Sequence, residues 1–207
     1  MNRHYIDTLN RTDSDLIFSM VPPGARVLDL GCGDCRLLGD LVRRKSVVGL
    51  GVDIDGRALT DGLAHGLSIY HADLDEGLVD FPDSSYDYVI LNQTLQVVKK
   101  PLMVIREMLR IGRFGIVGFP NFGFWSLRAE LFFKGRAPKS PALPFDWHDT
   151  PNIRVLTIRD FTATCEREGI RIVKEEYLMF SGWRRFPAAR LFANAFAHIG
   201  LFVITRR

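Results

Sequence analysis

Glycines and acids that lie close together near the start of the chain could hold a small anionic ligand. Residues 27–35 read Val-Leu-Asp-Leu-Gly-Cys-Gly-Asp-Cys, and the pattern places them between a buried strand and a helix. Gly31 and Gly33 allow the backbone to turn sharply and let a ligand approach without a Cβ in the way. Free N–H groups at the start of the following helix attract an anionic group such as a carboxylate. The turn therefore predicts a ligand site after the first strand.

Carboxylates at strand ends would complete that site. Asp29 precedes the turn on the first strand. Asp53 ends the second predicted strand, about twenty residues beyond the turn, where an acid can accept both hydroxyls of a ribose. Asp73 ends the third predicted strand and lies one strand further out. Because packing does not need acids at strand ends, Asp29 and Asp53 favour a turn that binds a ligand over a turn without one.

The same turn is compatible with three other interpretations. A nicotinamide-dependent dehydrogenase would need G-x-G-x-x-G, but the third glycine would fall on Arg36. Cys32 and Cys35 form a C-x-x-C pair, which could be a redox pair or half of a metal site. No second pair of metal ligands occurs at a suitable spacing, so we expect no metal. A purely structural strand-turn-helix is the last interpretation, because such folds sometimes lose their cofactor.

The composition fits one globular domain over residues 1–207. Of these residues 47% are apolar and 25% are charged, which is ordinary for a soluble protein. A net charge of +3 and scattered basic residues give little support to a nucleic-acid partner. No run reaches the ~18 to 20 apolar residues that span a bilayer, and the first residues lack a secretory apolar stretch. We therefore expect a cytosolic protein without a membrane partner, whose three cysteines stay reduced.

Short apolar runs alternate with amphipathic helical patterns along the chain, which predicts repeated β-α units and a mostly parallel sheet. Asp13 and Ser14 can cap a first helix, Asp55 a later one, and Thr157 another with Asp160 three residues on. A late helix is predicted over residues 186–196. The predicted strands cover residues 26–30, 47–53, 68–72, 88–91, 115–119, 170–173 continuing toward 179, and 201–204.

Residues 120–155 show aromatic residues, glycine and proline without a clear period. Connections of this length inside a compact domain are usually lids or binding loops. The connection and the late helix also supply the apolar residues that could contact a partner. For the connection, lid, interface and core are equally open, whereas helical spacing favours the core for the late helix. The candidates are Phe122, Phe124, Trp125, Leu131, Phe132 and Phe133 in the connection, and Leu191, Phe192 and Phe196 in the late helix.

A catalytic base is not obvious. After the fourth predicted strand, Asn92, Gln93, Thr94 and Gln96 offer hydrogen bonds but no group that titrates near neutrality. The candidates that remain are His148 and its neighbour Asp149 in the long connection, since imidazole has a suitable ordinary pKa and a carboxylate can orient it. On general grounds, a loop histidine with only local bonds is the more common case and is favoured over a base at His148.

Several segments resemble a known family. The run 27–34, Asp53 and the segments 73–75 and 81–91 resemble the motifs of class I S-adenosylmethionine-dependent methyltransferases. Segments 91–96, 119–123 and 147–153 resemble the methionine biosynthesis protein MetW family, and the Thr-Pro-Asn-Ile run within the last is the most specific. The resemblance covers nearly the whole chain. It implies a Rossmann-like α/β fold with a seven-stranded mixed sheet of order 3-2-1-4-5-7-6, its last strand antiparallel, and helices on both faces.

The resemblance also implies a cofactor, a partner and a function. The cofactor would be S-adenosylmethionine or S-adenosylhomocysteine, and the partner a homoserine O-acyltransferase of the MetX type. This leaves two functions open, namely an accessory protein of methionine biosynthesis and an active methyltransferase on a small-molecule acceptor. One departure concerns Cys35, where the family commonly has a further glycine. The implied cofactor contacts are Asp29, Gly31, Gly33, Asp53, Ile54, Asp73, Leu74 and Asn92.

Overall fold

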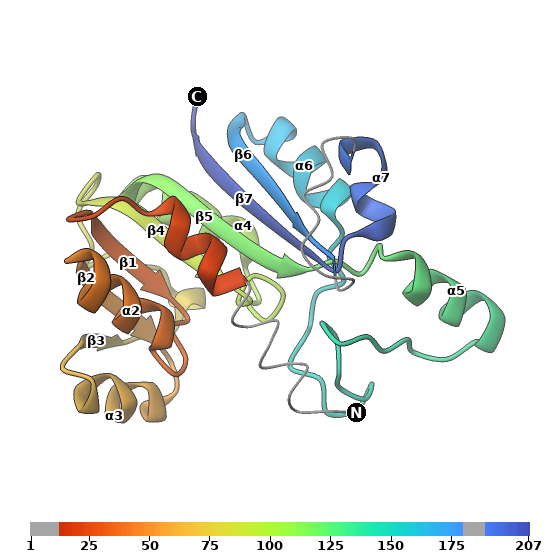
Figure 1. Cartoon of the computed structure of the whole chain (residues 1–207), viewed down its shortest axis with the longest axis horizontal. Coiled ribbons are helices and arrows are strands. Elements are labelled where there is room, and N and C mark those ends of the chain that lie inside the picture. Colours follow the sequence, from red (N-terminus) through yellow and green to blue (C-terminus); the bar gives the residue numbers. More distant parts are fainter. Residues whose placement is uncertain (1–12, 180–188) are drawn as a thin grey trace.

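The computed structural model describes residues 13–179 and 189–207, and its core is one seven-stranded sheet (Figure 1). The strand order is β3-β2-β1-β4-β5-β7-β6, as the resemblance implies. β7 pairs antiparallel with both neighbours, and the other pairings are parallel. The strands are β1 (Arg26–Leu30), β2 (Val48–Asp53), β3 (Ser68–His71), β4 (Tyr86–Asn92), β5 (Gly112–Pro120), β6 (Ile170–Leu178) and β7 (Ile199–Arg206).

Helices cover both faces of this sheet, and most begin or end where the sequence predicts. Asp55 caps one by accepting the Arg57 N–H, and Thr157 caps another by accepting the Asp160 N–H. Residues 13–20 are also helical. None of the described helices is long and apolar enough to cross a membrane. The helices are α2 (Arg36–Lys45), α3 (Gly56–Ala64), the 3-10 turn η1 (Leu74–Glu76), α4 (Pro101–Ile111), α5 (Trp125–Lys134), α6 (Ile158–Arg167) and α7 (Ala189–Phe196).

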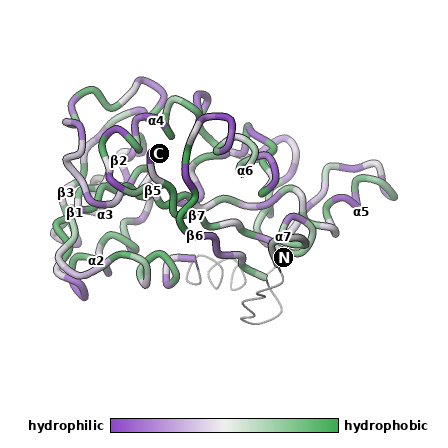
Figure 2. Tube along the Cα trace, turned by 90° about the horizontal axis from the view of Figure 1, so that it is seen from above, coloured by the Kyte–Doolittle hydropathy of each residue, from purple (hydrophilic) through white to green (hydrophobic). Residues whose placement is uncertain are grey.

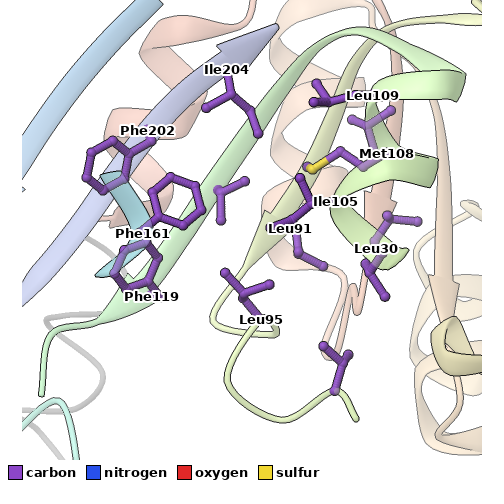
Figure 3. Packing of buried hydrophobic residues seen from close by; sticks show 14 of the residues in the cluster. Leu30, Leu91, Leu95, Ile105, Met108, Leu109, Phe119, Phe161, Phe202 and Ile204 are labelled. Carbon is purple, nitrogen blue, oxygen red and sulfur yellow. The ribbon is translucent and has the colours of Figure 1, made fainter. Parts of the chain in front are cut away.

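Alternation along the central strands produces two apolar layers. In β1, Val27 faces one layer, whereas Leu28 and Leu30 face the other. The first layer packs against α2 and the helix at residues 13–20, and the second against α4 and α6. Figure 3 shows the second layer, where Phe119 stacks on Phe202 with ring centroids 5.7 Å apart. A sheet buried on both faces explains why its central strands are continuous apolar runs.

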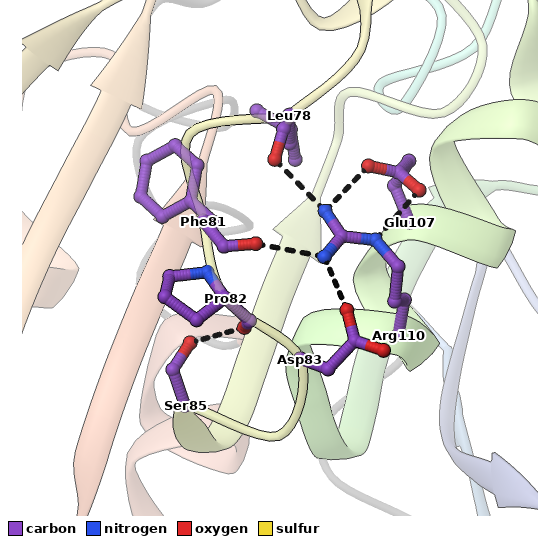
Figure 4. Close-up of polar contacts among 7 residues, drawn as sticks. All are labelled: Leu78, Phe81, Pro82, Asp83, Ser85, Glu107 and Arg110. Carbon is purple, nitrogen blue, oxygen red and sulfur yellow. Dashed lines mark hydrogen bonds and ion pairs between the residues drawn. The ribbon is translucent and has the colours of Figure 1, made fainter.

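One arginine fastens the segment between β3 and β4 to α4 (Figure 4). Arg110 forms a two-bonded ion pair with Glu107, with N···O distances of 2.9 and 2.8 Å. The same guanidinium donates to the carbonyls of Leu78 and Phe81 and to the carboxylate of Asp83. The carboxylates of Glu107 and Asp83 raise the pKa of Arg110, and the guanidinium in turn lowers the pKa of Glu107. The segment that carries Asp83 is therefore held by a planar, permanently charged fork.

The long connection contains a helix that the sequence pattern did not predict. α5 (Trp125–Lys134) extends away from the sheet (Figure 1), and Leu127 is its buried side chain. Figure 2 shows hydrophobic residues on this helix although it stands apart from the sheet. The predicted helix over residues 186–196 is described only as α7 (Ala189–Phe196), since residues 180–188 lie outside the described part.

Candidate functional site

The turn after β1 holds the glycine positions in the backbone conformation that the sequence predicts. Gly31 has a φ of 73° and Gly33 a φ of 51°. A Cβ on Gly31 would lie 2.4 Å from the Thr94 hydroxyl, so this position is closed to any side chain. A Cβ on Gly33 would meet no atom within 4 Å, so the backbone there borders open space. The turn therefore offers an exposed strip of main chain at Gly33 to a ligand.

Asp53 ends β2 directly beside this turn. Its carboxylate accepts the Gly33 N–H at 2.8 Å and the Asp55 N–H at 2.9 Å, one on each oxygen. Each carboxylate oxygen has a second lone pair, and the side chain is only half-buried. Asp53 can therefore still accept a pair of hydroxyl groups, which fits the predicted ribose contact.

Asp29 lies on β1 just behind the turn and is almost fully buried. Burial raises the pKa of its carboxyl to about 7, and the nearby charges of Asp53 and Asp34 act in the same direction. A buried acid that ionises near neutrality gains from a cation placed beside it. The carboxylate is therefore suited to a ligand with a positive group, such as an ammonium.

The remaining predicted contacts take different positions around β2, β3 and β4. Ile54 is 61% exposed, so its side chain is free to cover a flat ring. Asp73 caps η1 by accepting the Asp75 N–H at 2.8 Å. Leu74 packs into the core, which leaves only its main chain for a ligand. Asn92 is half-buried at the end of β4.

The structure adds a residue to this site that the sequence pattern assigned to a different role. Asp13, expected as a helix cap, is fully buried, and its carboxylate accepts hydrogen bonds from the side-chain amides of Asn92 and Gln93, each at 3.1 Å. Burial raises the pKa of Asp13, although these bonds act against the rise. The amide oxygens of Asn92 and Gln96 are buried without a hydrogen-bond partner in the described part of the chain. The end of β4 is thus rich in acceptors.

Cys35 occupies the position where the family commonly has glycine, and it adopts a left-handed φ of 58°. Its side chain is buried, and the sulfur lies 3.5 Å from the Ala58 carbonyl oxygen of α3. The sulfur also lies 3.6 Å from the Gly33 carbonyl oxygen, but a Cβ on Gly33 would meet no atom within 4 Å, so the thiol leaves the space beside Gly33 open. In the described part of the chain, no three His, Cys, Asp or Glu side chains group as metal ligands.

His148 and Asp149 lie in an exposed turn of the long connection. The His148 ring makes an edge contact with Trp147, and the Asp149 N–H donates to the Asp146 carbonyl. Among the described contacts, neither side chain reaches the site at the ends of β1, β2 and β4. Their assignment as base candidates thus stays a prediction, without a contact that supports it.

The connection also forms a groove of about 380 Å³ between α5 and residues 137–155. Phe133 is 81% exposed, and Phe132 and Trp125 also face solvent, so these three aromatic residues do not belong to the core. We expected the large apolar residues of the late helix to pack into the core. This was wrong for Phe192 and Phe196, which are exposed. Ala193 is buried in their place, because α7 contacts the core through small residues. The Leu191 side chain lies outside the described part.

Comparison with known proteins identifies one relative in methionine biosynthesis and one in ubiquinone biosynthesis. The family model described as methionine biosynthesis protein MetW matches residues 11–204. The bifunctional methionine biosynthesis protein MetXA/MetW of Rhodopirellula baltica is 41% identical over 162 residues, 74% of this chain and 26% of that protein. The ubiquinone biosynthesis O-methyltransferase of Hahella chejuensis is 33% identical over 125 residues, 57% of this chain and 47% of that protein. The chain thus spans about a quarter and about half of these two relatives.

A solved structure agrees with this chain at the level of the fold. Magnesium protoporphyrin IX methyltransferase from Synechocystis, crystallised with S-adenosylhomocysteine, matches with a TM-score of 0.70 and 15% identity, covering 100% of this chain and 89% of that one. With the strand order above, this likeness defines the fold as that of class I S-adenosylmethionine-dependent methyltransferases. Within that class, the chain belongs to the MetW family of methionine biosynthesis proteins.

Proposed function

We propose that the chain binds S-adenosylmethionine or S-adenosylhomocysteine and acts in methionine biosynthesis as an accessory protein of a homoserine O-acyltransferase. The observation that carries the cofactor part is the arrangement of Gly33 and Asp53, in which an open main-chain strip adjoins a half-buried carboxylate. The fused relative supports the choice of partner, because its name joins MetXA and MetW in one protein.

The residues of the site would divide the ligand among them. Asp53 would accept the ribose hydroxyls, the main chain at Gly33 would lie along the ligand, and the exposed side chain of Ile54 would cover the adenine. The buried carboxyl of Asp29 would gain a positive neighbour. When bound, S-adenosylmethionine supplies a sulfonium that makes its methyl group transferable.

The side chains at the end of β4 support the accessory role. Asn92, Gln93, Thr94 and Gln96 are amides and a hydroxyl, and the predicted base His148 has no described contact with them. S-adenosylmethionine is made from methionine. A protein that binds it and also contacts an early enzyme of the pathway can change the activity of that enzyme in response to the amount of product. Such a response needs a reciprocal coupling free energy between the two sites, typically ~1 to 3 kcal/mol.

Calorimetric titration with S-adenosylhomocysteine, with and without the acyltransferase, tests this proposal. We expect the two dissociation constants to differ by about fivefold or more. Asp53→Ala should weaken binding at least tenfold, whereas Asp40→Ala on the exposed face of α2 should not. Identical constants with and without the enzyme would contradict the coupling. Absence of nucleoside binding would contradict the cofactor part of the proposal. The remaining function would then be that of a structural partner without a cofactor.

A second candidate function is methyl transfer to a small molecule, which the burial of Asp13 favours. Its carboxyl has a raised pKa and bonds to Asn92 and Gln93, so an acid that can hold a proton lies at the end of β4. Incubation with methyl-labelled cofactor and cell metabolites, with and without the acyltransferase, separates the two functions. Label in a metabolite would establish transfer, whereas label that stays in the nucleoside would favour the accessory role.

A further inference from the structure

Two thiols face each other across the turn that carries Gly33. The Cys35 N–H donates to the Cys32 carbonyl at 2.9 Å and closes a four-residue turn, and the two sulfur atoms lie 3.7 Å apart. A turn of this kind holds its first and last Cα atoms within about 7 Å. A disulfide needs Cα atoms about 4.4 to 6.8 Å apart and a sulfur–sulfur bond of about 2.05 Å. The sulfurs need only approach by about 1.7 Å.

We propose that Cys32 and Cys35 are a modification site, at which a small-molecule disulfide such as glutathione disulfide oxidises the pair to a reversible intramolecular disulfide. In the first step, one protein thiolate attacks a sulfur of glutathione disulfide and releases one glutathione thiolate. In the second step, the other protein thiolate attacks the mixed disulfide and releases the second glutathione thiolate. The pair loses two electrons and two protons, and glutathione disulfide becomes two glutathione molecules.

The burial of the three cysteines assigns the order of these steps. Cys32 is half-buried and is the accessible thiol of the pair, whereas Cys35 is buried and suited to the second attack. Cys165 is buried in the apolar layer on the opposite face of the sheet. It therefore cannot reach either member of the pair, and it provides an internal control.

The surroundings of the pair determine the speed of the exchange. Burial raises the pKa of both thiols, and the carboxylates of Asp29 and Asp53 act in the same direction, with Asp34 adding to the effect at Cys35. Only the thiolate attacks, so the rate should rise about tenfold per pH unit in the neutral range. A slow exchange with strong pH dependence is therefore part of the proposal.

A bridge would also alter the turn that carries the candidate ligand site. In the reduced protein the Cys32 side chain packs against β2, where a Cβ on Gly51 would lie 2.7 Å from its sulfur, while Cys35 is directed at Ala58 of α3. Bridging draws both sulfurs from these positions, and Gly33 lies between them. We expect the dissociation constant for S-adenosylhomocysteine to rise at least threefold; this effect, unlike the bridge itself, rests on the proposed function.

The experiment equilibrates the reduced full chain with glutathione disulfide at several pH values, then denatures it, alkylates free thiols and maps them by mass spectrometry. We expect a species lighter by two hydrogen atoms in which Cys32 and Cys35 are protected, Cys165 is alkylated, and dithiothreitol reverses the change. Cys165→Ser should bridge as the wild type does, whereas Cys35→Ser should stop at a glutathione adduct on Cys32.

Each other outcome is informative. Free Cys32 and Cys35 after equilibration at high pH, or a wild-type glutathione adduct that never resolves, would overturn the modification site. A bridge that leaves nucleoside affinity unchanged would overturn its effect on the ligand. If the reduced chain binds no nucleoside, the proposed function fails, while the thiol map still decides the disulfide.

Discussion

At the scale of single residues, the site combines buried acids with an open turn. Asp29 and Asp13 are both buried, and both have carboxyl pKa values raised by burial. A buried carboxylate lowers stability unless a positive group or hydrogen bonds compensate it. Asp13 is compensated by the amides of Asn92 and Gln93, and a ligand with a positive group would compensate Asp29, which supports the proposed ligand-binding role.

The stability of the protein should carry the pH signature of Asp29. Its carboxyl titrates near 3.8 in the unfolded chain and near 7 in the folded one. The folded state therefore holds the proton more tightly, and the contribution of Asp29 to stability falls as pH rises from about 4 to 7 and is constant above. Asp29→Asn removes this loss. Urea unfolding should show a variant whose advantage over the wild type grows from pH 4 to 7 and then levels off; a difference independent of pH would contradict the assignment.

Part of the site could be predicted from residue types and spacing. The placement of Gly31, Gly33 and Asp53 follows from local rules, since a turn needs glycine and strand ends of one sheet meet at one edge. Asp13 could not be recognised in this way. Its partner Asn92 is 79 positions away, and a pattern that predicts a helix cap contains no information on that contact.

At the scale of elements, the Arg110 fork should be sensitive to its geometry. Arg110→Lys keeps the charge but offers one ammonium in place of a planar guanidinium with several donors. Because the bonds to the carbonyls of Leu78 and Phe81 are lost or weakened, we expect the free energy of unfolding to fall by about 1 to 3 kcal/mol. Chemical denaturation measures this difference.

A matched control is available on α2. Arg43 makes one ion pair, with Asp40, and both side chains are about half exposed. Arg43→Lys should change the free energy of unfolding by less than about 0.5 kcal/mol. Equal losses in the two variants would show that the fork on α4 has no special role.

A second prediction at this scale concerns the irregular segment before α6. The Gln96 carbonyl accepts the N–H groups of both Ile153 and Arg154, at 3.0 and 3.1 Å, and the Arg154 guanidinium donates to the Lys99 carbonyl. If a nucleoside orders the turn after β4, these two amides should exchange hydrogen more slowly. Hydrogen–deuterium exchange with S-adenosylhomocysteine should show slowing at residues 153–154 and none in β6. Unchanged exchange at residues 153–154 would show that ligand binding does not reach from the turn after β4 to the groove between α5 and residues 137–155.

The helix α5 shows why a pattern can fail for a whole element. A helix that packs against a sheet has apolar residues at helical spacing, which makes it predictable. α5 buries Leu127 and exposes Phe132 and Phe133, so its apolar residues do not form one face. The apolar residues of α5 show no helical period in the sequence because most of them do not pack against the core.

At the scale of the whole molecule, exposed apolar side chains lie on two separate parts of the structure. Trp125 and Phe133 are exposed on α5, whereas Leu63 is exposed on α3, far from α5 in Figure 1, and Val79 is exposed in the segment between η1 and β4. Replacing Trp125 and Phe133 together with alanine should abolish copurification with the acyltransferase and leave the melting temperature nearly unchanged. The double variant Leu63→Ala, Val79→Ala is the control and should still copurify. Retained binding by a folded Trp125, Phe133 variant would exclude α5 from the interface.

The sheet as a whole was predicted at two levels. Alternating strands and helices indicated parallel β-α units, and each predicted strand is present, with ends shifted by one or a few residues. The place of β7 came only from the family resemblance. Local patterns report which residues are buried, and the run Leu201–Phe202–Val203 would be buried equally well at several positions in the sheet.

The position of β7 has a consequence for how the chain folds while it is being translated. Among the described strands, β6 is at the edge of the sheet and pairs with β7 alone, and β7 follows it in the chain and separates it from β5. On the ribosome, where segments emerge in chain order, newly made β6 has no hydrogen-bonding neighbour until β7 has been translated and inserted. During that interval Ile170 and Leu178 remain exposed to solvent. A chaperone that recognises extended apolar segments would bind β6 most readily at this stage.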